Sequence, residues 1–259
     1  MKWSNKILIT MLVVFVAGLL ASNIVMKKEY DKVDKNDMYW TYGKVLDQHF
    51  KHLKIEGGNL TNIAFEQSPN CSVRVLHDWQ RVRENPIKTF VKGDTLFIQF
   101  TYSPKDEGEK NWMKWLTLVR IFSPELLSVE GVDTKIEMFK LKQKNLNVTM
   151  SGKSTFEVES FIPSLDTLNI SQKDSSEVVI EMSPEYKSPR THAAIKAPGL
   201  EIKSPEAMSI ESVNASVQGN SLLDIGHAQI NAMTLSIADS SGIILSGGAL
   251  KKLPKLNLP

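Results

Sequence analysis

The chain has 259 residues, of which 31 are Lys or Arg and 29 are Asp or Glu, so its formal net charge is +2. Proteins that bind nucleic acid usually carry a strong basic excess, so this balance predicts no nucleic-acid partner. Charged residues at 23% and hydrophobic residues at 42% are ordinary values for folded proteins and exclude wholesale disorder. The single cysteine, Cys71, excludes an intrachain disulfide framework and a zinc site built from several cysteines.

The N-terminus carries the clearest signal in the chain. Residues 7–26 read ILITMLVVFVAGLLASNIVM, a run of twenty residues without a charge. As a helix this run would measure about 30 Å, which is the thickness of the hydrocarbon core of a bilayer. Lys6 precedes it, and Lys27 and Lys28 follow it. The pattern predicts an N-terminal membrane anchor over residues 1–28, with the membrane as its partner through helix 7–26.

A cleaved signal peptide is the alternative interpretation of the same run. Its apolar region would end near Ala21, but Leu19 and Leu20 stand where a cleavage site needs small residues, so the sequence favours a retained anchor. No cysteine follows the run, which excludes a bacterial lipoprotein. Lysines lie on both sides of it, so the charge rule alone does not fix the orientation.

Residues 29–49 are expected to form a juxtamembrane connector. Asn36 or Asp37 is placed to cap a short helix running toward Gln48. His49 and His52 have a spacing that suits a metal on a helix, but no third ligand lies nearby, so no metal site is predicted.

From residue 50 the hydrophobic pattern has a period of two. Phe50, Leu53 and Ile55 open a first strand, and LFIQF at 96–100 alternates after the Gly93-Asp94 turn signal. No amphipathic helix of convincing length follows residue 50. The sequence therefore predicts an all-β domain over residues 50–250 and a C-terminal tail over 251–259.

A Leu-x-Val/Ile triplet recurs along this domain and suggests how its strands are arranged. The triplets begin at Leu127, Leu146, Leu168, Leu200 and Leu235, with Ala215-Ser216-Val217 as a sixth. Outer residues of each triplet point one way and the polar central residue points the other way. A period near 20 residues favours a parallel β-helix, or β-solenoid, whose longest step holds an insertion at 183–195. A β-sandwich is the alternative; the lack of any aromatic residue after Tyr186 favours the narrower coil.

The same stretches resemble the adhesin family of Bacteroidetes-type bacteria described as head GIN domain proteins. The resemblance covers roughly residues 50–250 and is carried by FKHLKIEGGNLTNIAFEQ (50–67), VKGDTLFIQF (91–100), VRIFSPELLSVEGVDTKIEM (119–138), LNVTMSGKSTFEV (146–158) and SLLDIGHAQINAMTLSIADSSGIILSGG (221–248). The usual Ser-Gly-Ser-Gly turns are reduced here to single pairs. The resemblance implies a parallel β-helix in the cell envelope, outside the cytoplasm, and supplies no catalytic residues.

No constellation of catalytic residues is found in the sequence, and no cofactor site is predicted. Phosphate-binding loops, nucleophile elbows and zinc-protease motifs are absent from it. Asp106, Glu107 and Glu109 are read as a solvated acidic loop. Polysaccharide-active β-helix proteins gather Asp, Lys and Arg on one face. The candidates here are Asp224, His227 and Asp239, with Arg190 and His192 of the insertion, and their spacing does not require them to meet.

The sequence thus predicts a membrane-anchored, non-catalytic, adhesin-like envelope protein that binds a protein or glycan through its polar face or its insertion. The alternatives are an enzyme acting on envelope polysaccharide and a structural protein that self-associates. The expected location is the bacterial inner membrane, crossed once, with the C-terminal domain in the periplasm. After signal cleavage the alternative is secretion or the outer surface.

Overall fold

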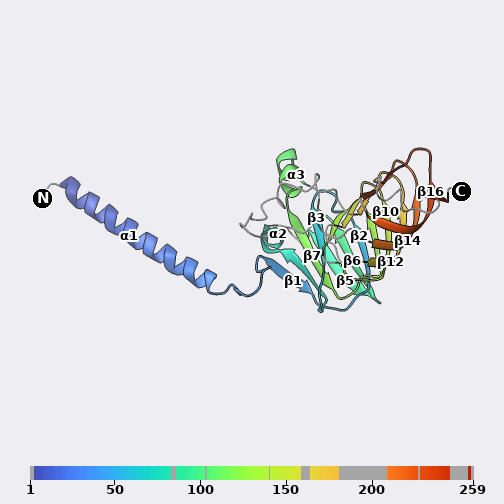
Figure 1. Cartoon of the computed structure of the whole chain (residues 1–259). Helices are drawn as coiled ribbons and strands as arrows, with labels where there is room; N and C mark the ends of the chain where they lie inside the picture. The colour runs from blue at the N-terminus through green and yellow to red at the C-terminus, as the bar shows by residue number, and fades with distance from the viewer. Residues whose placement is uncertain are drawn as a thin grey trace, which may run out of the picture. The chain divides into compact units, whose positions relative to one another are not determined.

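The computed structural model of the chain describes residues 3–82, 86–102, 104–139, 141–158, 164–180, 209–226, 228–245 and 256–257. It divides the chain into two compact units, Met1–Tyr42 and Gly43–Pro259 (Figure 1). The predicted insertion at 183–195 and most of the predicted tail at 251–259 lie outside the described residues.

The first unit is dominated by helix α1, Trp3–Tyr30, which buries none of its residues. It is long and apolar enough to cross a membrane, and signal sequences pass the same test. The apolar helix expected over 7–26 is thus confirmed.

The short helix expected in the connector is wrong, because residues 31–41 form turns. The Asp34 carboxylate accepts a hydrogen bond from the backbone N–H of Asn36, and Asp37 accepts one from Tyr39, both at 2.9 Å. Such bonds from an aspartate to the backbone two residues ahead stabilise turns in competition with helix.

The second unit consists of β-strands and two short helices. In chain order its elements are β1 (Tyr42–Leu46), β2 (His52–Glu56), β3 (Asn62–Gln67), β4 (Ser72–Leu76), α2 (His77–Val82), β5 (Ile87–Lys92), β6 (Thr95–Phe100), α3 (Glu107–Met113), β7 (Thr117–Ser123), β8 (Ser128–Val132), β9 (Lys135–Phe139), β10 (Asn145–Ser151), β11 (Thr155–Val158), β12 (Ser164–Gln172), β13 (Glu177–Ile180), β14 (Ser209–Val217), β15 (Leu222–Gly226), β16 (Gln229–Ile237), β17 (Gly242–Leu245) and β18 (Leu256–Asn257).

These strands form two nine-stranded sheets that face each other as a sandwich (Figure 1). Sheet A has the order β1-β4-β7-β3-β9-β11-β13-β15-β17, and sheet B has the order β18-β16-β14-β12-β10-β8-β2-β6-β5. Both sheets are mixed, since β4 runs antiparallel to β7 in sheet A and β5 runs antiparallel to β6 in sheet B. Neither sheet closes on itself.

The predicted parallel β-helix is therefore wrong, and the fold is a two-sheet, mostly β structure with a terminal helix. The triplets at 127, 146, 168, 215 and 235 do lie on neighbouring strands of sheet B, while the triplet at Leu200 falls outside the described residues. Alternation with period two is the same for a strand in a coil and a strand in a sandwich, so it did not separate the two folds. The absence of aromatic residues after Tyr186 also does not separate the two folds, because the aromatic side chains of the core come from earlier strands.

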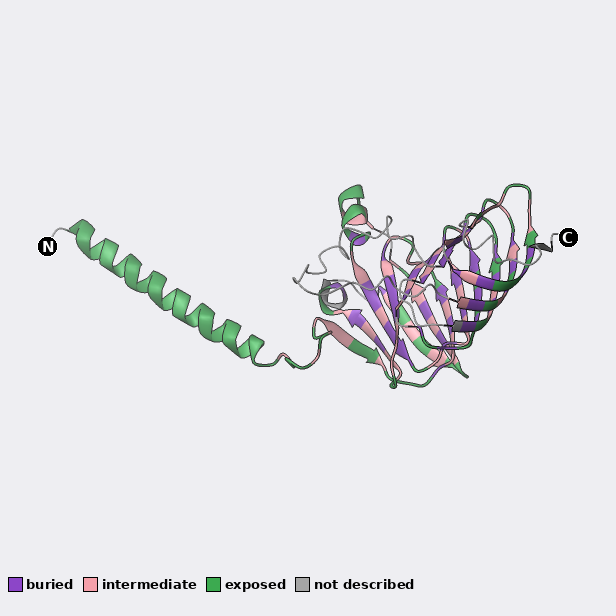
Figure 2. Cartoon of the chain, viewed as in Figure 1, coloured by how far each residue is buried: buried purple, intermediate pink, exposed green. Residues whose placement is uncertain are grey.

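The core lies between the two sheets, and along many of the strands buried positions (purple) alternate with half-buried (pink) or exposed (green) ones (Figure 2). Phe50, Phe65 and Phe156 are completely buried there among Leu, Ile and Val side chains. Neighbouring strands contribute to continuous columns, as where Phe156 of β11 lies between Ile136 of β9 and Val178 of β13 in register. Burying each such side chain contributes about 1.5–3 kcal/mol, so these columns hold the sheets together.

The turns from sheet B to sheet A share one backbone requirement. Asp133, Gly152, Asp174 and Gly219 occupy successive turns, and all have φ between +51° and +68°. A Cβ on Gly152 would lie 2.5 Å from the Asp133 carboxylate, and one on Gly219 would lie 2.7 Å from the backbone of Asp174. Aspartate and glycine therefore alternate in successive stacked turns. The missing side chain of each glycine leaves room for the neighbouring carboxylate to accept a hydrogen bond from the next turn. Asp133, for example, accepts from the Lys153 N–H at 2.8 Å.

A buried hydroxyl precedes several strands of sheet A. These side chains are at most 2% exposed and belong to Thr61, Thr134, Ser154, Ser176 and Ser221. Ser176 and Ser221 are hydrogen-bonded at 3.2 Å, and the Thr134 N–H donates to Ser154 Oγ at 3.1 Å. Thr61 and Ser154 donate to the carbonyls of Leu116 and Ser151, so several of these hydroxyls satisfy backbone groups where the chain passes between the sheets.

We expect Phe156→Ala to destabilise the second unit by about 3–5 kcal/mol, because it removes a fully buried ring and leaves a cavity between β9 and β13. The neighbouring Thr155→Ala is the matched control, since Thr155 lies on the outer face of the same strand and its loss should cost less than about 1 kcal/mol. Chemical denaturation of the full chain measures both. Equal effects would contradict the assignment of the core.

Candidate binding surface

The outer face of sheet B carries a regular array of small polar side chains over strands β10, β12, β14 and β16. In-register positions on these parallel strands form three rows that cross the sheet. We call this array the ladder surface. Its rows are Asn145, Thr167, Ser212 and Ala232; Asn147, Asn169, Asn214 and Thr234; and Thr149, Ser171, Ser216 and Ser236. All of these residues are exposed or half-buried.

The middle row is joined by side-chain hydrogen bonds. Asn214 Nδ2 donates to Asn169 Oδ1 at 2.9 Å, and Asn169 Nδ2 donates to Asn147 Oδ1 at 2.7 Å. Asn147 Nδ2 ends the chain of bonds by donating to the Leu127 carbonyl at 3.1 Å. Each amide uses only part of its bonding capacity along the row, since it has two N–H donors and two acceptor positions. The asparagines are therefore fixed in place and still able to bond a ligand.

The ladder surface is electrically neutral, since none of its positions is ionisable. Neighbouring strands lie about 4.8 Å apart, and alternate residues along one parallel strand lie about 6.6 Å apart. The array therefore presents hydroxyl and amide groups on a repeating grid. This chemistry suits a neutral, hydroxyl-rich ligand better than a charged one.

The rows continue across sheet B into strands with different chemistry. His52 Nδ1 and Ser128 Oγ are hydrogen-bonded at 2.7 Å in the row of the asparagines. In the next row, Lys54 Nζ lies 2.7 Å from the Glu130 carboxylate, and this bond raises the pKa of Lys54 above its ordinary value.

Further along the same row, Phe90 of β5 and Phe97 of β6 stack at 5.0 Å with an interplanar angle of 6°. The neutral array thus borders an ion pair and an aromatic pair.

The outer face of sheet A is charged, in contrast to the ladder surface. Arg74 and Arg120 are register partners on β4 and β7, and Glu137 and Glu157 are register partners on β9 and β11. Burial is the main cause that raises the pKa of Glu157, and the nearby carboxylates Glu137 and Glu177 add to it, while Lys135 opposes it. Lys135 Nζ lies 3.6 Å from Glu137, so the carboxylates of this face take part in ion pairing.

Other residues singled out in the sequence have structural contacts. Asp106 caps α3 by accepting from the Glu109 N–H at 2.8 Å, so the expected solvated loop is instead the start of a helix. Asp224 accepts from the Gly226 N–H at 2.8 Å, and Asp239 is exposed in the turn after β16. Arg190, His192 and His227 lie outside the described residues.

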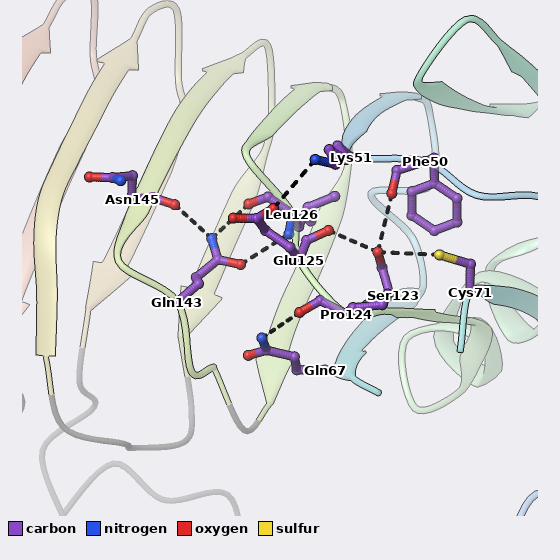
Figure 3. Close-up of polar contacts among 10 residues, drawn as sticks. All are labelled: Phe50, Lys51, Gln67, Cys71, Ser123, Pro124, Glu125, Leu126, Gln143 and Asn145. Carbon is purple, nitrogen blue, oxygen red and sulfur yellow. Dashed lines mark hydrogen bonds and ion pairs between the residues drawn. The ribbon is translucent and has the colours of Figure 1, made fainter. Parts of the chain in front are cut away.

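Cys71 lies at a polar corner where the loop from β7 to β8 meets the core (Figure 3). Its Sγ is 3.6 Å from Ser123 Oγ, whose single O–H lies within donating distance of two carbonyls, that of Glu125 at 2.8 Å and that of Phe50 at 3.2 Å. The buried side chain of Gln143, which precedes β10, accepts from the N–H and donates to the carbonyl of Leu126 on this loop. The half-buried thiol is thus one member of a network that fixes this loop.

A shallow cleft of about 280 Å³ lies beside this corner. Gln67, Ser68, Pro69, Pro124 and Lys142 line it. Gln67 bridges its walls by donating to the carbonyl of Pro124 at 2.6 Å and accepting from the N–H of Lys142. Since Gln67 is committed to these backbone bonds, the cleft is part of the loop packing.

The sequence predicted a polar outer face, but it did not predict which residues of neighbouring strands are in register. Asn147 and Asn169, central residues of their triplets, share one row as expected. Ser216 and Ser236 are central in later triplets yet fall in the neighbouring row, where Ser216 pairs with Ser171. The asparagine of β14 that completes the ladder, Asn214, lies just before its triplet and was missed.

No family model matches this sequence, and no curated protein matches it significantly. Among solved structures, it is similar to a "putative adhesin" of Parabacteroides distasonis, at TM-score 0.50 and 14% identity, covering 78% of this chain and 71% of that one. It is similar to a "putative adhesin" of Bacteroides fragilis at TM-score 0.43 and 16% identity, covering 78% of this chain and 90% of that one. It is similar to a "putative lipid binding protein" of Parabacteroides distasonis at TM-score 0.42 and 16% identity, covering 78% of this chain and 80% of that one.

These structures belong to Bacteroidetes proteins, and at such identities the first of them shows a shared fold alone. The second unit therefore shares a mostly β fold with that first structure. None of the comparisons gives a head GIN domain, so that resemblance rests on the sequence stretches alone.

We expect Glu157→Gln to raise stability at neutral pH. Since the folded-state pKa of Glu157 lies above its ordinary value of 4.5, the folded protein holds this proton more tightly than the unfolded chain. Stability therefore falls as pH rises from 4.5 through the folded pKa, and glutamine removes this loss. Urea unfolding at pH 7 should show a higher midpoint for the variant. The two midpoints should converge below pH 4.5, and a variant that is less stable at pH 7 would contradict the desolvation of Glu157.

Proposed function

We propose that this chain is a membrane-anchored, non-catalytic envelope protein that binds a glycan or protein through the ladder surface of sheet B. The observation that carries the proposal is the asparagine row Asn147-Asn169-Asn214, whose amides are fixed by one another and keep bonding capacity toward solvent. Ligand binding by groups that are already ordered loses little side-chain entropy. The adhesin description of the Parabacteroides protein, transferred here only as part of this proposal, agrees with a binding role.

A neutral glycan is the ligand class that fits the ladder surface best. Sugar hydroxyls both donate and accept, as the Ser, Thr and Asn side chains of the rows do. The surface offers no charge for an acidic polysaccharide. It also has no large apolar side chain of the kind that dominates the centre of protein interfaces. A protein ligand would have to be bound mainly through polar contacts.

The anchor defines the location in this proposal. Helix α1 is retained in the inner membrane, and the second unit lies in the periplasm. The poor cleavage site before Ala21 and Ser22 supports retention over release.

Asn169→Arg tests the ladder surface directly. The variant removes the central amide, leaves bonds of Asn147 and Asn214 unmade, and places a charge in a neutral array. Lost hydrogen bonds of about 1–3 kcal/mol correspond to a drop in affinity of roughly fivefold to a hundredfold. Binding of the full chain in nanodiscs to an array of neutral and acidic glycans is the measurement.

Thr155→Arg is the matched control, because it adds the same side chain to the outer face of sheet A. We expect it to leave binding unchanged. Equal loss in both variants, or retention in both, would contradict the assignment of the ladder surface. Adhesion of cells that display each variant extends the same comparison to protein ligands.

Anchor retention and orientation are tested by protease treatment of cells that express a C-terminally tagged chain. We expect the tag to stay in the carbonate-resistant membrane fraction, to survive in intact cells and to be digested after the outer membrane is opened. N-terminal sequencing that starts beyond Ala21, with the tag in a soluble fraction, would overturn the anchor. Protection after the outer membrane is opened would overturn the orientation.

A further inference from the structure

We propose that Trp112 and Trp115, at the C-terminal end of α3, form a docking surface for the lipid bilayer in which α1 is anchored. The inference rests on the retained anchor of the proposed function, and it concerns a surface separate from the sheet face that carries the ligand site. It assigns a membrane contact to the second unit itself, in addition to the helix.

The two tryptophans are unusually exposed. Their exposed fractions are 50% and 62%, the highest of the large hydrophobic side chains in the described part of the second unit. They are three residues apart, and the Trp115 N–H donates to the Trp112 carbonyl at 3.2 Å, so the helical turn continues to Trp115. Residues at this spacing lie on the same side of a helix.

Their exposure is not that of a loose loop, because the structure beneath them is packed. Met113, between the two, is only 3% exposed, and so is Trp79 of α2. The Trp112 ring stacks on Trp79 at 6.2 Å with an angle of 28°, and Trp79 meets Tyr102 edge-on at 4.9 Å. Trp112 is thus held by a buried aromatic cluster while half of its surface remains outside.

Charge is distributed unevenly along α3. The acidic residues lie at its N-terminus, where Asp106 caps the helix and Glu109 accepts a hydrogen bond from the Lys105 N–H at 2.7 Å. Lys114 stands between the two tryptophans, and its Nζ bonds the neutral Asn111 amide at 3.2 Å. The apolar end of α3 is therefore the basic end, which complements lipid phosphates.

A bilayer is the occupant that these features favour. Indole rings settle at the membrane interface, where an apolar ring and a polar N–H are both accommodated. The strand that follows α3, β7, is separated in sheet A from β1 by β4 alone, which amounts to about 10 Å. The connector enters the second unit at β1, and residues 31–41 span at most about 40 Å. The tether thus keeps lipid at high effective concentration near this edge of the sheet, whereas a glycan or protein would have to come from solution.

Photocrosslinking tests the inference without altering the chain. The full chain is placed in phosphatidylcholine nanodiscs containing a lipid with a diazirine in its acyl chain, illuminated and digested. We expect adducts on α1, which report the anchor, and also on peptides covering residues 111–120, with none on peptides of β14 or β16. Adducts on α1 alone would overturn the docking surface and leave the anchor intact. Their absence from α1 as well would overturn both.

Fluorescence provides a second readout with a defined control. In a Trp3→Phe/Trp40→Phe background, the remaining emission comes from Trp79, Trp112 and Trp115. We expect brominated lipids to quench at least a third of it, and the further change Trp112→Phe/Trp115→Phe to abolish the quenching while the unfolding midpoint stays near that of the background. Equal emission in brominated and ordinary lipid would overturn the proposal. Protection of these tryptophans from acrylamide by soluble glycans, and not by lipid, would overturn it in favour of a sugar site.

Discussion

The register of the parallel strands in sheet B is the constraint on which the rest of the structure depends. Leu146 of β10 lies beside Leu168 of β12, which lies beside Val213 of β14, and all three are completely buried. The intervening residues, Asn147, Asn169 and Asn214, then fall in line on the opposite face. A slip of one residue in any strand would expose its aliphatic side chains and bury its asparagine. The hydrophobic core and the ladder surface are therefore two consequences of a single alignment.

That alignment is maintained at the turns as well as in the strands. Asp133, Gly152, Asp174 and Gly219 all adopt positive φ, a conformation that glycine enters freely and aspartate tolerates better than most residues. Because each turn lies against the next, the alternation of aspartate with glycine also avoids steric clashes between neighbouring turns. The Gly152 N–H donates to the Asp174 carboxylate at 3.2 Å, while a Cβ at residue 152 would lie only 2.5 Å from the Asp133 carboxylate of the preceding turn. Turns that stack in this way fix how far each strand is offset from its neighbour.

Local patterns in the sequence predicted the strands and the polar character of one face, because both follow from alternation within a single strand. The arrangement of the sheets was wrong, because it depends on which distant strands pair. For example, β3 pairs with β7 and β9 and not with its sequence neighbour β4, and β4 joins β7 in the opposite direction. Nothing within residues 72–76 encodes that direction.

The short helices were missed for a related reason. α3 has only 7 residues and is stabilised by its Asp106 cap and by the burial of Met113, so no amphipathic period has room to develop. The sequence that encodes its cap, KDEGE, looks the same as a solvated acidic loop. The tertiary contact between Trp112 and Trp79 decides between the two, and these residues are far apart in the chain.

Charged, neutral polar and aromatic side chains are concentrated on three different surfaces of the second unit. The outer face of sheet A carries charged residues, some of which pair with one another, as Lys135 does with Glu137. The ladder surface satisfies only part of its bonding capacity within the row, which leaves neutral donors and acceptors for a ligand. Trp112 and Trp115 are half or more exposed, and large apolar side chains cost free energy in water. In the proposed arrangement, lipid contact would use the indoles and ligand binding would use the ladder surface, and this division follows from strand alternation and one capped helix.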